Sequence, residues 1–457
     1  MNVFDHIIVG TGQATGTLLG GLLHRDESIA VIEGKNVGGT CVNTGCTPTK
    51  TLVASAKTAN MVRRAGEYGV ETENTRVNFS KVMERMNELR HSNSDGFENW
   101  LRSDERITFY KEWAKFESDK QVRVGGEVIE GKNIYINVGA RARKLPISGI
   151  DEVDWLDNER LLELDELPDH LVIIGGSYIG LEFGQMFRRF GSEVTVLEAA
   201  PQIMSREDED VAEEARSILQ SEGITLHEGV KVELLEQKEE KEIEIEISVD
   251  GEKQRISGSH LLLAAGRVPN SDTLQLGNTS IEPGQRGFIP VDDYCKTSVD
   301  GVYAVGDVNG KGAFTHTSVN DAEIVLDQLR GGDRKISDRI PVYAMFIDPP
   351  LGRVGMSEKE ALDSGKKVLK ATRPMSKINR AKEMGETNGF AKLLVDAETD
   401  KILGATVFGP GGDEIINMFA AYMYSDLPCR AYRKSVLVHP TISELMPWIL
   451  DDLKPVN

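Results

Sequence analysis

The 457-residue sequence contains no apolar run of the roughly 20 residues that a membrane-spanning helix requires. Its opening, MNVFDHIIVGTG, lacks the charged start and the cleavable apolar core of a secretory signal peptide. Positive charge is also scarce, because 53 Lys and Arg stand against 73 Asp and Glu, for a formal net charge of −20. Nucleic acids and anionic membranes bind basic clusters. We therefore expect a cytoplasmic protein with neither of them as a partner.

The composition is otherwise that of an ordinary globular protein, with 40% hydrophobic and 28% charged residues. The length exceeds what one hydrophobic core supports, so we expect two to four domains. No long linker or low-complexity tract separates them.

Two segments of the sequence share one pattern. Residues 3–9 are apolar and run into the loop GTGQATG, an apolar helical stretch and a strand that ends at Glu33. The same order returns at residues 171–198, with the loop GGSYIG and a strand that ends at Glu198. The number of residues from the start of the glycine loop to the acid at the strand end is the same in both segments. This repetition predicts an α/β protein with two Rossmann-like dinucleotide-binding domains.

The two glycine loops have a clear physical purpose. Glycines let the backbone turn tightly and approach a pyrophosphate, which then rests on a helix N-terminus where amides are free. Both loops are imperfect, since Thr15 and Ser177 stand where glycines belong. The strand, helix and acid around each loop still favour dinucleotide binding over a plain turn.

Glu198 bears on the choice of pyridine nucleotide. A carboxylate suits the free 2′-hydroxyl of NAD and repels the 2′-phosphate of NADP. The sequence therefore favours NADH, although Arg206 lies near enough in sequence to recruit a phosphate, so NADPH stays possible.

The remaining segments have their own patterns. Residues 51–100 indicate helices, and residues 105–138 indicate short strands. The stretch EIEIEISVDGEKQRIS alternates isoleucine with charge around Asp250-Gly251, which predicts a hairpin. From about residue 343, strands and helices mix in a separate C-terminal α+β domain.

Two of the four cysteines, Cys41 and Cys46, stand close together in GGTCVNTGCTPTK, residues 38–50. They could form a structural disulfide, a metal-binding site or a redox-active pair. A structural zinc site needs about four ligands, and no other Cys or His lies near in sequence, so we expect no metal. Cys295 and Cys429 are isolated, and buried packing is the simplest interpretation of each.

The spacing of the pair requires a bend. A straight helix rises about 7.5 Å over five residues, more than the roughly 6.8 Å that a disulfide tolerates between Cα atoms. Gly45 can supply that bend, and Thr47-Pro48 predicts a cap and first-turn proline for a following helix. Cys46 would then lie beside a helix N-terminus, where the pKa of a thiol falls, and Lys50 adds positive charge. A cytoplasmic pair of this kind is more often catalytic than structural.

These motifs together resemble the class I flavoprotein pyridine nucleotide-disulfide oxidoreductases. The resemblance covers essentially the whole chain, in order: the first loop, GGTCVNTGCTPTK, NVGARA, the second loop, AAGRVPN, VYAVGDV and HPTISE. It implies an FAD-binding domain at residues 1–145, an inserted NAD(P)H-binding domain at 146–265, and a central part of the FAD domain at 266–342. A dimerisation domain at 343–457 follows, so the resemblance also implies a homodimer whose active sites are shared between subunits.

The resemblance implies unequal roles for the thiols. Cys46 would lie against the flavin, and Cys41 would attack the substrate. Lys50 and Glu182 match a lysine–glutamate pair beside the reactive edge of the flavin.

Other site residues follow in the same way. Tyr178 matches a tyrosine that covers the nicotinamide pocket until the cofactor displaces it, and Asp307 matches the aspartate that holds the ribityl chain. His439 and Glu444 match a dyad that reaches the partner's thiols. The candidate cofactor residues are Gly10, Gly12, Gln13, Ala14, Glu33, Thr40, Lys50, Gly139, Asp307 and Thr315 in the FAD parts, and Gly175, Ser177, Tyr178, Ile179, Gly180, Glu198 and Gly266 around the nucleotide site.

The electron acceptor is left open between a small disulfide and a soft metal ion such as copper(II). GCTPTK and MFIDPPLGRVGMSE look most like mercuric reductase-like proteins, and among these like the reactive-chlorine-resistance flavoproteins. The ending WILDDLKPVN has no vicinal cysteine pair, so we do not expect efficient mercury reduction. Dihydrolipoamide dehydrogenase is one alternative, and a flavin-bearing redox sensor with little turnover is another.

Overall fold

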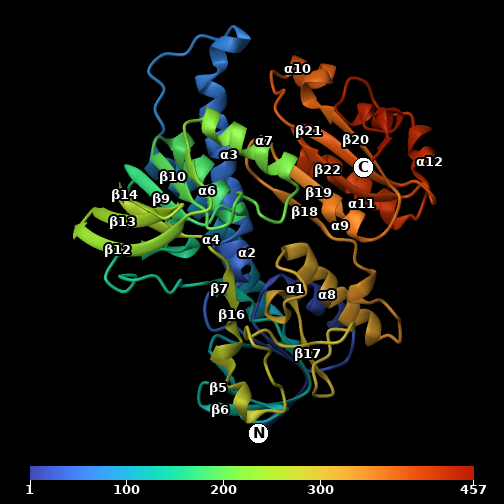
Figure 1. Cartoon of the computed structure of the whole chain (residues 1–457). Coiled ribbons are helices and arrows are strands. Elements are labelled where there is room, and N and C mark those ends of the chain that lie inside the picture. The colour runs from blue at the N-terminus through green and yellow to red at the C-terminus, as the bar shows by residue number, and fades with distance from the viewer. Residues whose placement is uncertain (457) are drawn as a thin grey trace.

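The computed structural model describes residues 1–456 and has a mixed α/β architecture with three main sheets. Figure 1 shows the first sheet near the N-terminus, the second around β9 and β10, and the third in the orange and red C-terminal part. No helix among these residues is long and apolar enough to cross a membrane.

The first sheet has the strand order β3-β2-β1-β6-β5-β4, and β17 pairs with β6. β1, β2, β3 and β17 run parallel to their neighbours, as expected for a dinucleotide-binding unit. The strands are β1 (Asn2–Val9), β2 (Ile29–Ile32), β3 (Ile107–Tyr110), β4 (Ala114–Phe116), β5 (Gln121–Val124), β6 (Glu127–Ile136) and β17 (Val302–Ala304). The helices of this part are α1 (Gln13–Leu22), α2 (Gly39–Asn43), α3 (Cys46–Arg63), α4 (Phe79–Ser103) and α8 (Thr315–Gln328).

The second sheet has the order β11-β10-β9-β15-β8, all parallel. Beside it lies the predicted hairpin, in which Asp250 and Gly251 both have positive φ. The elements are β8 (Trp155–Leu156), α5 (Asn158–Leu161), β9 (His170–Ile174), α6 (Tyr178–Phe190), β10 (Glu193–Leu197), α7 (Glu209–Ser221), β11 (Thr225–His227), β12 (Lys231–Glu239), β13 (Glu242–Val249), β14 (Glu252–Gly258) and β15 (His260–Leu263).

The chain crosses between the two sheets twice, and the two crossings pair with each other. β7 (Ala140–Ala142) leaves the first sheet and lies antiparallel to β16 (Arg267–Pro269), which returns to it. β17 then joins the first sheet beside β6. This topology supports our proposal that residues 1–145 and 266–342 form one domain with residues 146–265 inserted.

The third sheet is antiparallel throughout, with the order β18-β19-β22-β21-β20-β23. It begins at Val342, one residue before the predicted boundary. Its strands are β18 (Val342–Met345), β19 (Leu351–Gly355), β20 (Val368–Pro374), β21 (Phe390–Asp396), β22 (Ile402–Phe408) and β23 (Lys454–Pro455), and its helices are α9 (Glu358–Asp363), α10 (Asn379–Glu383), α11 (Gly412–Tyr424) and α12 (Cys429–Arg433).

An aromatic cluster joins the long helices to the second sheet. Phe79 of α4 packs against Phe187 and Phe190 of α6, with ring centroids 6.0 and 6.1 Å apart. Truncating such a buried phenylalanine costs about 3–5 kcal/mol, several times the worth of an exposed ion pair. Packing therefore fixes α6 against α4, and Leu52 and Ala56 place α3 in the same buried cluster.

Candidate active site

The first glycine loop follows β1 and is packed too closely for side chains. Gly10 has φ +98°, and a Cβ there would overlap the carbonyl oxygen of Asn137. A Cβ on Gly39, whose φ is +62°, would lie 2.9 Å from the Cα of Gly12. The loop thus lies against the start of α2, and its free amides sit at the N-terminus of α1.

Thr15 has a structural reason for replacing the expected glycine. Its hydroxyl donates to the Gly10 carbonyl oxygen at 2.8 Å and accepts from Nδ2 of Asn137 at 2.9 Å. In the second loop a Cβ on Gly180 would overlap the corresponding carbonyl oxygen, that of Gly175. The first loop is therefore held by a hydrogen bond from the Thr15 hydroxyl, whereas the second loop allows a direct backbone approach because Gly180 has no side chain.

The two acids at the strand ends have matching contacts. Glu33 accepts from the backbone N–H of Thr11 at 3.0 Å, and Glu198 accepts from that of Gly176 at 2.7 Å. Each also accepts from the backbone N–H two residues further along, Glu33 at 2.8 Å and Glu198 at 2.7 Å. The carboxylates are held at the loop edge, where the ribose of a bound dinucleotide would lie.

Asp307 and Arg267 fit a polar group such as the ribityl chain of FAD. Nε of Arg267 lies 3.7 Å from Oδ2 of Asp307 and is buried without a hydrogen-bond partner among residues 1–456. Burial raises the pKa of Asp307, and the nearby guanidinium only partly opposes it. The Nε of Arg267 needs a hydrogen-bonding partner, which a bound polyol chain would supply.

The structure also places five further cofactor candidates. Nη2 of Arg267 donates to the hydroxyl of Thr40 at 3.4 Å. Gly139 and Gly266 have φ of +66° and +98° where the chain turns into β7 and β16. Gln13 donates to the Gly38 carbonyl at 3.3 Å. The Ala14 side chain is fully buried in the core, so only its backbone can face a ligand.

The two candidate redox cysteines lie on successive helices. Cys41 is in α2 and half-buried, whereas Cys46 is the first residue of α3 and exposed. A Cβ on Gly45 would lie 2.8 Å from the Thr40 carbonyl oxygen, so this bend requires glycine, as predicted. The predicted cap was wrong: Gly45 is the N-cap, because the helix begins at Cys46 and takes Thr47 into its first turn.

The environment makes the two thiols unequal. A hydrogen bond from Cys41 lowers the pKa of Cys46 to about 6, and the Thr315 hydroxyl, 3.3 Å from its sulfur, and the charge of Lys50 act in the same direction. The same interaction and burial raise the pKa of Cys41. At neutral pH the thiolate therefore resides on Cys46, whereas Cys41 needs a base.

Lys50 and Glu182 form a direct ion pair, Nζ to Oε2, at 2.7 Å. Lys50 projects from α3 and Glu182 from α6, two helices that contribute to the same buried hydrophobic cluster. Phe346, just after β18, donates its N–H to Glu182 at 2.8 Å, and the Lys50 ammonium lies 4.3 Å from its ring centre. The C-terminal domain thus helps to build this part of the site.

The first turn of α6 carries three nucleotide candidates. Ser177 is the N-cap, Tyr178 is the first helical residue, and Ile179 is 37% exposed. The Tyr178 hydroxyl donates to Glu207, a residue that the sequence had not indicated.

His439 and Glu444 form the predicted dyad, with Nδ1 2.9 Å from each carboxylate oxygen. The His439 side chain is 76% exposed. Within residues 1–456 it makes no hydrogen bond to Cys41 or Cys46, so one chain alone does not complete the proposed arrangement. No group of three or more His, Cys, Asp or Glu among these residues could hold a metal ion.

The lowered pKa of Cys46 gives a testable titration. The ultraviolet thiolate absorbance of reduced protein, taken as the wild type minus Cys46→Ser, should fall as pH drops through about 6. Lys50→Met removes a nearby positive charge and should move that midpoint upward. A wild-type midpoint near the free-cysteine value of about 8.5 would contradict this assignment.

Comparisons with known proteins identify the family of this chain. Residues 4–322 match the family described as "Pyridine nucleotide-disulphide oxidoreductase", and residues 342–450 match its dimerisation domain. The chain belongs to this family of flavoprotein oxidoreductases, and the predicted fold and enzyme class are confirmed.

Individual relatives cover nearly the whole chain. "Probable pyridine nucleotide-disulfide oxidoreductase RclA" of Escherichia coli strain K12 is 38% identical over 97% of this chain and 98% of its own length. A mercuric reductase of Bacillus cereus is 31% identical, covering 96% of this chain and 70% of its own, and a dihydrolipoyl dehydrogenase of Cupriavidus necator is 31% identical, covering 97% and 96%. A solved Cu(II) complex of the HOCl-induced flavoprotein disulfide reductase RclA from E. coli has a TM-score of 0.88 and 36% identity over 98% of this chain and 99% of that one.

Proposed function

We propose that this protein takes electrons from NADH and passes them through FAD and the Cys41–Cys46 pair to a soft metal ion or a small disulfide. One observation supports the proposal above all: two adjacent thiols of opposite pKa shift lie beside the Lys50–Glu182 pair. A structural cysteine pair has no need of this asymmetry.

Each candidate catalytic residue has a proposed role in the reaction. Bound flavin supplies the hydride chemistry between the pyridine nucleotide and the dithiol. Cys46 holds the thiolate at its helix N-terminus, and Lys50 stabilises negative charge there. His439 of the partner subunit takes the proton from Cys41, and Glu444 of the partner subunit fixes the imidazole through its Nδ1.

Both acceptor classes allow a balanced reaction at Cys41. With a disulfide, the Cys41 thiolate attacks one sulfur and releases one thiolate; Cys46 then attacks Cys41, releases the second, and the Cys41–Cys46 disulfide forms. With copper(II), the dithiolate gives one electron to each of two ions, which leaves copper(I) and the same disulfide.

Copper(II) is the acceptor that we place first. A relative similar over nearly all of this chain has been solved as a Cu(II) complex, and exposed thiol sulfur is a soft ligand for copper(I). Lipoamide, the disulfide partner of a dihydrolipoamide dehydrogenase, is the second candidate, supported by the ordered His439–Glu444 pair, which suits thiol–disulfide exchange. The mercuric reductase and dihydrolipoyl dehydrogenase relatives are equally similar, so identity does not separate these acceptors.

We further propose NADH as the donor, a homodimer as the assembly and the cytoplasm as the location. Glu198 at the edge of the second loop favours the 2′-hydroxyl of NAD. The free buried thiols of Cys295 and Cys429 suit a reducing compartment.

An anaerobic screen tests the proposal. Purified holoenzyme is mixed with NADH or NADPH and with copper(II), mercury(II), lipoamide or glutathione disulfide, and nucleotide oxidation is recorded. We expect turnover with copper(II) and a higher kcat/KM with NADH than with NADPH. Flavin that neither nucleotide reduces would refute the enzymatic function, and lipoamide as the best acceptor would favour the second candidate.

A further inference from the structure

We propose that Glu207 is a latch that holds Tyr178 closed over the nicotinamide pocket, and that Tyr343 of the C-terminal domain sets the strength of this latch. The inference rests on the proposed function and on the role that the family resemblance implies for Tyr178, which is to cover that pocket. It adds two positioning residues from outside the glycine loop.

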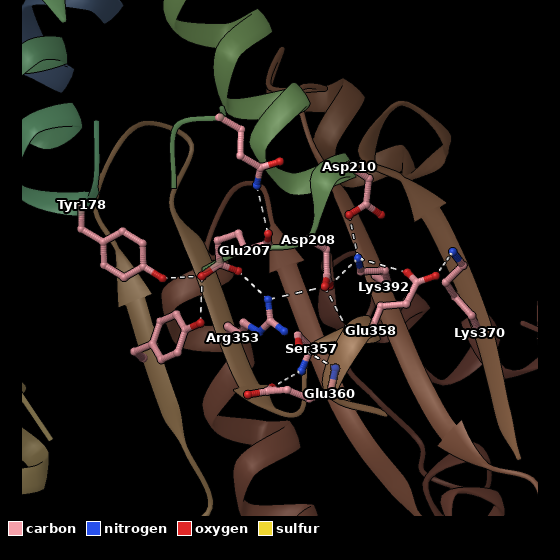
Figure 2. A network of polar contacts seen from close by, with 12 residues as sticks. Tyr178, Glu207, Asp208, Asp210, Arg353, Ser357, Glu358, Glu360, Lys370 and Lys392 are labelled. Carbon is pink, nitrogen blue, oxygen red and sulfur yellow. Dashed lines mark hydrogen bonds and ion pairs between the residues drawn. The ribbon is translucent and has the colours of Figure 1, made fainter. Parts of the chain in front are cut away.

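The latch is a buried carboxylate with three donors. Glu207 lies in the segment that connects β10 to α7, and its side chain is fully buried. Its Oε1 accepts from the Tyr178 hydroxyl and, at 2.8 Å, from the Tyr343 hydroxyl, and its Oε2 accepts from Arg353 at 2.5 Å. Figure 2 shows Tyr178 and Arg353 converging on Glu207 from opposite sides.

The carboxylate is fixed from behind by a buried charge network. Arg353 of β19 also lies 3.8 Å from Asp208, which is 2.8 Å from Lys392 of β21. Lys392 is 2% exposed and bonds Asp210 at 2.7 Å as well (Figure 2). A buried charge is stable only when paired, so this network keeps Glu207 in place whether or not Tyr178 is bound to it.

Tyr178 and Tyr343 share one acceptor oxygen, and this has a specific consequence. When Tyr178 swings away, Oε1 of Glu207 keeps the Tyr343 hydroxyl as a partner and is not left unsatisfied. Tyr343 therefore lowers the cost of opening, whereas the hydroxyl of Tyr178 raises it. Packing keeps the two rings together, with centroids 5.7 Å apart, and Tyr343 stacks in turn on Phe314 at 5.5 Å.

The latch predicts opposite effects for two matched substitutions. A nucleotide binds only the open form, so its apparent affinity scales with the open fraction. Tyr178→Phe removes the latch bond and should tighten NAD⁺ binding about tenfold, the usual worth of a hydrogen bond to a charged group. Tyr343→Phe removes the competing donor and should weaken NAD⁺ binding several-fold. Glu207→Gln, a neutral acceptor, should fall between the wild type and Tyr178→Phe.

The measurement is calorimetric titration of each holoenzyme with NAD⁺ and, separately, NADP⁺, together with its thermal midpoint. Each tyrosine variant loses one buried hydroxyl, so both midpoints should fall by similar amounts while the affinities move in opposite directions. Affinities that move in the same direction, or stay unchanged, overturn the latch and leave the proposed function standing. A wild type that binds neither nucleotide overturns both.

Discussion

Cys41→Ser is expected to abolish electron transfer to copper(II) and to disulfides while the protein keeps its flavin. The substitution changes one half-buried atom on α2 and leaves both glycine loops intact, so the FAD-binding residues keep their contacts. Without the Cys41 thiol no disulfide with Cys46 can form. Removing a catalytic nucleophile lowers kcat by a factor on the order of 10⁴ or more.

The comparison needs a matched control. Cys295→Ser makes the same chemical change at a fully buried cysteine of the first domain, outside the proposed site. Flavin content, measured by absorbance of the purified protein, should be equal in both variants. Acceptor-dependent NADH oxidation should fall only with Cys41→Ser, and retained activity in that variant would show that Cys41 is not the residue that meets the acceptor.

The parts of the fold that the sequence predicted are those in which short-range signals and tertiary structure agree. The two strand–loop–helix–strand–acid units, the hairpin at Asp250-Gly251 and the bend at Gly45 all depend on residues close together in the chain. In each, a glycine or a turn pair meets a steric requirement that no other residue satisfies as well.

The parts that the sequence did not predict depend on contacts between distant segments. Asn137, just after β6, donates hydrogen bonds to Gly12 and Thr15. The motif NVGARA contains this residue but does not predict these hydrogen bonds. Glu207 and Arg353 come from different proposed domains; Glu207 stands in no motif, and the motif MFIDPPLGRVGMSE contains Arg353 without indicating its partner. Their pairing required the C-terminal sheet to be placed against the second unit.

The error at Thr47 has a local reason. Thr47-Pro48 is typical of an N-cap followed by a first-turn proline. However, proline is tolerated anywhere in the first turn, because the N–H that it lacks would have no hydrogen-bond partner within the helix. The helix therefore extends back to Cys46. This places the sulfur two positions deeper in the helix terminus than predicted and strengthens the case for its lowered pKa.

His439→Ala is expected to lower acceptor-dependent turnover by about 10²–10⁴-fold, the usual contribution of a general base. The raised pKa of Cys41 makes this large, because its thiol stays protonated at neutral pH unless a base removes the proton. Glu444→Gln keeps the shape of the dyad and should cost less, since it weakens the orientation of the imidazole without removing it.

A mixing experiment tests whether His439 serves the partner's thiols. The dyad is exposed in the single chain and makes no contact with the dithiol there, so a shared site requires two subunits. A heterodimer of Cys41→Ser and His439→Ala subunits has one site with both residues intact. Co-refolding two inactive homodimers should therefore restore about one quarter of wild-type activity, given random pairing in a two-fold dimer. If His439 acted within its own chain, every site would lack one residue and mixing would restore nothing.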